Sequence, residues 1–303
     1  MENTSNSTNP QFGFLSTCKD YYELCKPRVV MLLVFTAIIG MFLATPGMVP
    51  WEPLVYGTIG IGLAASSAAA INQVVDQKID SAMRRTEARP LPKGNVTNTQ
   101  AMIFAVAIGT IAMAILTFLV NGLTAWLTFL SLIGYAVVYT MFLKHATPQN
   151  IVIGGAAGAA PPVLGWTAVT GTIDPNSLWL FLIIFAWTPP HFWALAIHRK
   201  DEYAKVDVPM LPVTHGVEYT RRQVLLYTII MVAVTLMPFA VRMSGIVYLV
   251  GAIILNAIFL YYAIKMQSGK DLSSPMKTFG YSIIYLMLLF ALLLIDHYLP
   301  QSF

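Results

Sequence analysis

Residues 101–120 read AMIFAVAIGTIAMAILTFLV, a stretch without one charged side chain. About 20 apolar residues in a helix are enough to cross the hydrocarbon core of a lipid bilayer. Lipid offers no hydrogen-bond partners, so every backbone N–H and C=O of such a segment must be paired within a helix. The stretch therefore predicts a helix that spans a membrane.

The rest of the chain repeats this pattern in further apolar stretches of similar length. They lie approximately at Val29–Thr45, Leu54–Asn72, Leu123–Leu143, Ile151–Thr170, Leu178–Ile197, Val224–Val241, Ile246–Lys265 and Phe279–Tyr298. Only 11% of the residues are charged, whereas a soluble domain carries about 25%. We therefore predict an all-α, polytopic membrane protein, with a polar tail over residues 1–27 and a bundle of nine transmembrane helices over residues 28–303.

The basic residues indicate the orientation in the membrane. With nine spans, all of the 18 Lys and Arg residues except Arg242 lie on the side of the N-terminus. An excess of basic residues marks the cytoplasmic side, so we expect a cytoplasmic N-terminus in a bacterial inner membrane. Residues 1–14 are polar and lack Lys and Arg, which predicts disorder and argues against a mitochondrial transit peptide. The bases are spread over several loops, so no nucleic-acid partner is expected.

Small residues and prolines predict how the helices pack. Residues 64–70 read AASSAAA and residues 154–160 read GGAAGAA. Small side chains let transmembrane helices approach closely, so we expect the second and fifth spans to be internal. Pro161–Pro162 and Pro189–Pro190 should kink or interrupt their helices, and such breaks can shape a cavity.

An acidic motif lies where the second span leaves the membrane. Asn72, Asp76 and Asp80 are spaced by four, so a continuous helix places them on one face, with Arg84 one turn further. Carboxylates near lipid are costly unless they have a partner, and Mg²⁺ takes carboxylate and phosphate oxygens together. The motif therefore predicts a site for a metal–diphosphate complex. The plainer alternative is a solvated helix end, in which the two aspartates pair with Lys78 or Arg84.

Further polar residues on the same side are candidates for this site. Glu202 offers another metal ligand and Arg199 a phosphate contact, although Asp201 competes with Glu202 and the cluster can also be a solvated loop. Lys144 can reach a phosphate or serve only as a positive anchor at the membrane surface.

Two histidines occupy one face of the sixth predicted span, because His191 and His198 are seven residues apart. A polar residue within a span is a functional candidate. His191 can bind a haem iron or move a proton. The alternative is a histidine that simply bonds a carbonyl group of a neighbouring helix.

Four stretches in the expected order resemble the UbiA-type membrane prenyltransferases and, within that superfamily, the protohaem IX farnesyltransferases. They are NQVVDQKIDSAMRRTEARPLPKG at 72–94, TPQNIVIGGAAGAAPPVLGW at 147–166, WTPPHFWALAIHRKDEY at 187–203 and VPMLPV at 208–213. The opening Lys26-Pro-Arg28 also agrees with the family. One residue departs from it, because the family has Asp where this chain has Glu202.

The resemblance implies a nine-helix bundle with a lateral opening to lipid. It implies Mg²⁺-dependent transfer of farnesyl from farnesyl diphosphate to a vinyl group of haem B, which gives haem O for terminal oxidases. A haem A synthase or a terminal oxidase assembly factor is an implied partner besides the lipid bilayer.

The resemblance also implies roles for residues by position. Those that would hold the metal and the diphosphate are Asn72, Asp76 and Asp80. Those that would contact phosphate are Arg84, Arg89 and Lys144. Those on the haem side would be His191 and His198.

Two other functions remain open from the residues alone. The acidic motif fits equally well an enzyme that prenylates another aromatic acceptor, such as a quinone precursor. Nine spans with proline breaks also suit a secondary transporter, although a transporter is expected to keep its important polar groups near the bilayer midplane.

Overall fold

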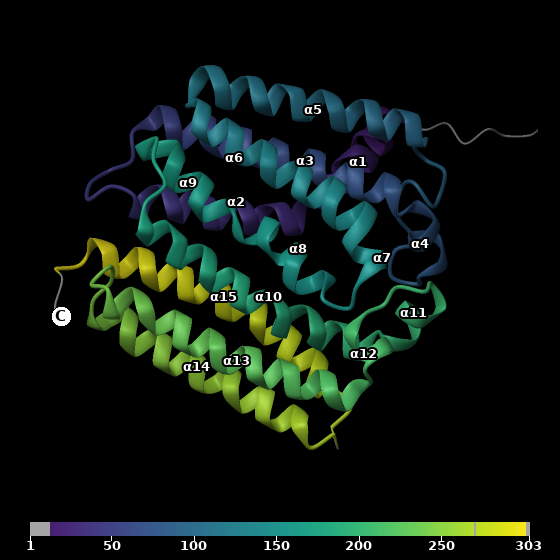
Figure 1. The fold of residues 1–303 in the computed structure, drawn as a ribbon. Helices are drawn as coiled ribbons and strands as arrows, with labels where there is room; N and C mark the ends of the chain where they lie inside the picture. Colours follow the sequence, from purple (N-terminus) through teal and green to yellow (C-terminus); the bar gives the residue numbers. More distant parts are fainter. Residues whose placement is uncertain (1–12, 270, 301–303) are drawn as a thin grey trace, which may run out of the picture.

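The computed structural model describes residues 13–269 and 271–300, and every regular element in this part of the chain is a helix (Figure 1). The first half contains α1 (Phe14–Leu24), α2 (Pro27–Leu43), η1 (Pro53–Gly57), α3 (Thr58–Val75), α4 (Gln77–Ala82), α5 (Asn98–Leu119), α6 (Gly122–Ile133), η2 (Gly134–Leu143), α7 (Lys144–Ala146), α8 (Asn150–Ala159) and α9 (Pro161–Thr170). The second half contains α10 (Pro175–His198), α11 (Lys200–Lys205), α12 (Leu211–Thr214), α13 (Val217–Ala240), α14 (Ile246–Gln267) and α15 (Ser274–Tyr298). The η segments are π-helical.

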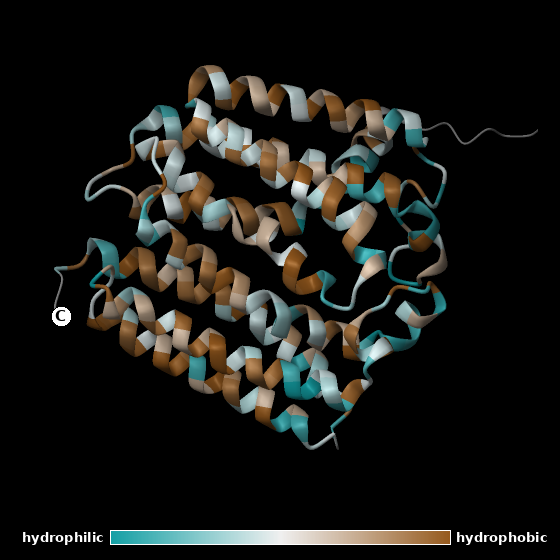
Figure 2. Ribbon diagram, in the orientation of Figure 1, coloured by the Kyte–Doolittle hydropathy of each residue, from teal (hydrophilic) through white to brown (hydrophobic). Residues whose placement is uncertain are grey.

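The long helices confirm the polytopic membrane fold. Among the described residues, eight helices are long and apolar enough to span a bilayer. A ninth span results if Leu15–Leu24 and Pro27–Leu43, which meet at a bend of 56°, are taken together. The long helices run side by side, and hydrophobic residues cover their middle parts, whereas hydrophilic residues gather at the ends (Figures 1 and 2).

The segment before the first predicted span contains a helix that the sequence interpretation placed within a polar tail. Helix α1 is attached to α3 by Gln73, whose Nε2 donates to the carbonyl oxygens of Glu23 and Leu24 at 3.0 Å each. Leu24 is fully buried. An amphipathic helix that docks in this way is missed by a search for long apolar runs. Apart from residues 13 and 14, the segment predicted to be disordered lies outside the described residues.

Small residues bring helix backbones into contact, as the sequence predicts. Within the most apolar part of each span, 44% of the second helical span (Pro53–Val75) and 61% of the fifth (Asn150–Thr170) are buried, against 17% for Asn98–Leu119. Helices α2 and α9 touch at two glycines, Gly40 and Gly165. A Cβ atom on Gly165 would lie 1.9 Å from the Ala37 carbonyl oxygen, and one on Gly40 would lie 2.2 Å from the Pro162 carbonyl oxygen.

The contact at Gly165 gives a stability prediction. Gly165→Ala places a methyl group against the Ala37 carbonyl group of α2, and we expect it to destabilise the fold by about 1–3 kcal/mol. Gly158→Ala is the matched control, because nothing lies within 4 Å of its added Cβ. Thermal unfolding of the detergent-purified variants measures both. Equal midpoints for the two variants would contradict the close approach of α2 and α9.

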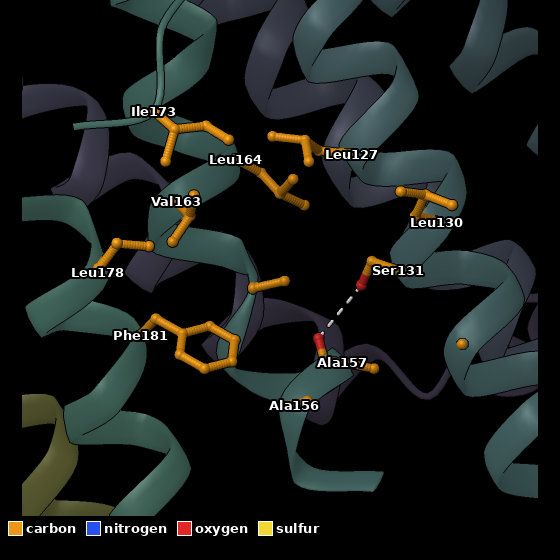
Figure 3. Close-up of a pocket in the computed structure, with 12 residues that line it drawn as sticks. Leu127, Leu130, Ser131, Ala156, Ala157, Val163, Leu164, Ile173, Leu178 and Phe181 are labelled. Atoms are coloured by element: carbon orange, nitrogen blue, oxygen red, sulfur yellow. Dashed lines mark hydrogen bonds between the residues drawn. The ribbon is translucent and has the colours of Figure 1, made fainter. Parts of the chain in front are cut away.

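The two proline pairs behave differently. The fifth span is interrupted between α8 and α9, where Pro161 begins the second helix, whereas α10 continues through Pro189 and Pro190 as one helix. The break borders an open hollow of about 410 Å³, lined mainly by apolar residues, most of them from α6, α8, α9 and α10 (Figure 3). Ser131 is the one polar side chain among the lining residues, and its Oγ donates to the Ala157 carbonyl oxygen at 3.3 Å. One of the two proline pairs therefore interrupts its helix, and that interruption lies beside a hollow.

Candidate active site

The acidic motif sits at the junction of α3 and α4, at the end of the bundle where α7, α11 and α12 also lie (Figure 1). The helix breaks at Asp76 (φ −83°, ψ 0°). The four-residue spacing of backbone hydrogen bonds nevertheless continues, because Asp76 N donates to Asn72 O at 2.9 Å and Asp80 N to Asp76 O at 2.8 Å. The three side chains therefore stay on one side despite the break. All three are buried, with exposed fractions of 4–5%.

Asn72 connects the motif to the fourth span. Its Nδ2 donates to Asp76 Oδ2 at 2.9 Å and to Thr140 Oγ1 at 3.1 Å. Thr140 Oγ1 in turn donates to the Tyr135 carbonyl oxygen at 2.8 Å, within the π-helix η2. These bonds fix the amide orientation of Asn72 and, through it, the position of the Asp76 carboxylate.

Each aspartate has a cationic partner supplied by another segment. Lys144 Nζ lies 2.7 Å from Asp76 Oδ1, and Arg89 Nη1 lies 2.5 Å from Asp80 Oδ2. Buried charges without partners are strongly unfavourable, so these cations account for the burial of both carboxylates. The plainer alternative, pairing with Lys78 or Arg84, does not occur.

The loop after α4 explains why Arg89 reaches the motif and Arg84 does not. Helix α4 ends at Ala82, and Met83 is extended (φ −108°, ψ 124°), so the helical face does not continue to Arg84. Arg84 is exposed. The chain then folds back, held by Thr86 Oγ1, which donates to the Asp80 carbonyl oxygen at 2.9 Å.

Lys26 is a further member of the cluster that the sequence interpretation gave no role. It lies between α1 and α2 in the left-handed backbone region (φ 49°), which a non-glycine residue seldom adopts. Its Nζ donates a hydrogen bond to Asn72 Oδ1. Burial lowers the pKa of Lys26 from 10.5 to about 7, and the positive charge of Arg89 acts in the same direction. The only sign of this residue in the sequence was the agreement of Lys26-Pro-Arg28 with the family pattern.

The second loop does not join the acidic motif in this structure. Arg199 Nη1 and Glu202 Oε1 form an ion pair at 2.8 Å within α11 and its N-cap. In the described ranges, no group of three His, Cys, Asp or Glu side chains converges as a metal site. Glu202 thus does not complete a three-carboxylate set with Asp76 and Asp80, because Arg199 holds it locally. Glu202 Oε2 is buried and lacks a hydrogen-bond partner among the described residues.

The two candidate histidines have opposite surroundings. His191 is buried in α10, whereas His198, the last residue of that helix, is exposed. Seven residues of helix separate them by about 10 Å along the axis. The structure therefore surrounds the His191 side chain with protein, whereas the His198 side chain is exposed.

The donor set fits a hard divalent cation. Two buried carboxylates, Asp76 and Asp80, lie on one side of the α3–α4 junction, and Mg²⁺ prefers oxygen ligands of this kind. Asp76 Oδ1 accepts no hydrogen bond of good geometry among the described residues, despite the nearby Lys144. Asp76 and Asp80 are the residues that would hold such an ion, with Asn72 beside them.

Comparison with known proteins shows which family the chain belongs to. The model of the UbiA prenyltransferase family matches residues 33–293. The chain belongs to the UbiA prenyltransferase family. A relative from Nitrosococcus oceani, protoheme IX farnesyltransferase, is 57% identical over 95% of this chain and 97% of its own length. A relative of the same name from Hahella chejuensis is 59% identical over 100% and 99%.

Two solved structures share the fold. A digeranylgeranylglyceryl phosphate synthase superposes with a TM-score of 0.78 at 17% identity, over 93% of this chain and 99% of that one. A UbiA homologue from Archaeoglobus fulgidus, bound to GPP and Mg²⁺, has a TM-score of 0.62 at 17% identity, over 90% and 99%. These likenesses confirm the all-α membrane bundle, and the sequence relatives confirm the resemblance to the farnesyltransferase branch.

Proposed function

We propose that this chain transfers the farnesyl group of farnesyl diphosphate to a vinyl group of haem B, which gives haem O and releases diphosphate. The observation that carries the prenyl diphosphate part of the proposal is the buried acidic motif with its basic partners at one end of a UbiA-type bundle. The relatives called protoheme IX farnesyltransferase support this donor and acceptor. We further propose that the site faces the cytoplasm, because the basic residues gather on one side of the predicted spans. We propose a bacterial inner membrane because the relatives are bacterial.

The proposed reaction replaces one bond to carbon C1 of the farnesyl group by another. The C1–O bond breaks, and its electron pair stays on the departing diphosphate. The π electrons of the vinyl group form the new bond to C1, and water then adds to the resulting cation and releases a proton, which leaves a hydroxyl group. Magnesium ions, when bound, neutralise the diphosphate charge and make it a better leaving group.

The residues of the chain have separate tasks in this proposal. Asp76 and Asp80 hold the metal–diphosphate complex, and Asn72 orients Asp76 through the bond to its Oδ2. Lys144 and Arg89, which neutralise the carboxylates here, shift to the phosphate oxygens and stabilise the departing charge. Burial of the cluster keeps water away until the new carbon–carbon bond has formed.

Purified protein in detergent, supplied with farnesyl diphosphate and haem B, tests the proposal. We expect a porphyrin product with the mass of haem O, and diphosphate release that requires haem B and stops when EDTA removes Mg²⁺. Consumption of a quinone precursor in place of haem B would contradict the proposed acceptor. Movement of substrate across a vesicle membrane without diphosphate release would instead identify a transporter.

A further inference from the structure

His191 is held in a fixed orientation inside the second half of the bundle. Its ring stacks between Trp187, at 4.2 Å between centroids and 18° between planes, and Phe279, at 4.6 Å and 25°. The ring of Phe192 lies 4.9 Å from that of His191 in a T-shaped arrangement. His191 is 7% exposed. The ring therefore has one orientation, and its two nitrogen atoms have distinct environments.

Ser282 of α15 determines which nitrogen of His191 carries the proton. Ser282 Oγ lies 2.6 Å from His191 Nδ1 and 2.6 Å from the Phe279 carbonyl oxygen. A serine hydroxyl has one proton, and a carbonyl oxygen only accepts. The hydroxyl proton therefore goes to Phe279 O, so the serine must accept from Nδ1–H. In this neutral tautomer Nε2 carries the free electron pair.

Nε2 of His191 is not engaged by another residue of the described chain. It has no hydrogen-bond partner within residues 13–269 and 271–300, and it is not among the fully enclosed polar atoms of this part of the chain. A histidine whose Nδ1–H is bound by a second residue and whose Nε2 is free has the arrangement of a metal-binding imidazole. Since the proposed acceptor is an iron porphyrin, the ligand that suits this nitrogen is its iron.

On the basis of the proposed function, we propose that Ser282 is a positioning residue, which fixes His191 in the tautomer whose Nε2 binds the iron of the porphyrin substrate. The bond that matters is the one to the serine hydroxyl. A second bond joins the same two helices, because Trp187 Nε1 donates to the Ser282 backbone carbonyl oxygen at 2.8 Å. A change of the Ser282 side chain therefore removes the bond to His191 and keeps this helix contact.

Titration of the purified protein with haem B alone, without prenyl diphosphate, tests the proposal through the Soret band. We expect Ser282→Ala to weaken haem binding about 10- to 100-fold, the usual effect of losing a hydrogen-bond partner of a metal-binding histidine. Ser282→Thr keeps a hydroxyl group and should restore most of the affinity. Unchanged affinity and spectrum in Ser282→Ala would overturn the positioning role.

His191→Gly tests the iron bond itself. We expect loss of the wild-type Soret band and its return on addition of imidazole, which fills the vacated space. His215→Gln is the matched control and should keep the spectrum, because His215 is an exposed residue near the C-terminal end of α12. An unchanged spectrum in His191→Gly, with normal turnover by the wild type, would overturn the inference and leave the proposed function standing. Failure of the wild type to make haem O would instead contradict the proposed function.

Discussion

Asp76→Asn is expected to reduce farnesyl transfer by at least about 100-fold, the scale seen when one preorganised electrostatic contact to a reacting group is removed. Asn has nearly the shape of Asp but no charge. It therefore keeps the hydrogen-bonded frame around Asn72 and loses the ability to hold a divalent cation. Steady-state release of diphosphate, measured with farnesyl diphosphate and haem B, gives the effect on kcat.

Stability must be separated from catalysis in this experiment. Asp76→Asn leaves Lys144 as a buried cation without its partner, and breaking a buried ion pair costs about 3–5 kcal/mol. The double variant Asp76→Asn with Lys144→Met removes both charges, so we expect it to recover much of the lost thermal stability and to remain inactive. A stable double variant with wild-type turnover would contradict the role of Asp76.

Arg89→Gln is expected to lower kcat/KM for farnesyl diphosphate by about 100-fold, because it removes a guanidinium group that neutralises Asp80 and is placed to bind phosphate. Arg89→Lys should recover only part of the activity, since lysine lacks the planar fork that binds two oxygen atoms at once. Initial rates over a range of farnesyl diphosphate concentrations measure both variants.

A neighbouring residue provides the control for Arg89. Lys93 belongs to the same loop, its backbone N–H donates to the Arg89 carbonyl oxygen at 3.1 Å, and its side chain is exposed. Lys93→Gln removes the same charge from the same side of the membrane, so we expect less than a twofold change. Equal losses in Lys93→Gln and Arg89→Gln would show that the loop acts through its total charge and not through the contact with Asp80.

The sequence predicts the fold well because lipid makes the signal simple. A long apolar run has to be a helix in a bilayer, so the spans follow from composition alone. Helix α1 escaped this reasoning, because its stability comes from docking against α3 through Gln73 and Leu24. Its eleven residues, FLSTCKDYYEL, mix polar and apolar side chains and contain no long apolar run.

Helix geometry predicted the acidic motif of the candidate site, whereas Arg89 was named through the family resemblance and Lys144 as a nearby base. The spacing of Asn72, Asp76 and Asp80 puts them on one face, and the structure keeps them there. Extrapolation by one more turn to Arg84 failed, because the helix ends at Ala82. The contact of Lys26 with Asn72 joins residues 46 positions apart and depends on the left-handed backbone of Lys26, so no local pattern encodes it.

The central claim is that the buried carboxylates hold a divalent cation against the diphosphate of the donor. Calorimetric titration of the wild-type protein with a non-hydrolysable farnesyl diphosphate analogue, with Mg²⁺ and with EDTA, tests this claim most directly. We predict tight binding with Mg²⁺ and at least about tenfold weaker binding with EDTA, since Asp76 and Asp80 then face the diphosphate without an intervening cation. Equal affinity in both conditions would contradict the account.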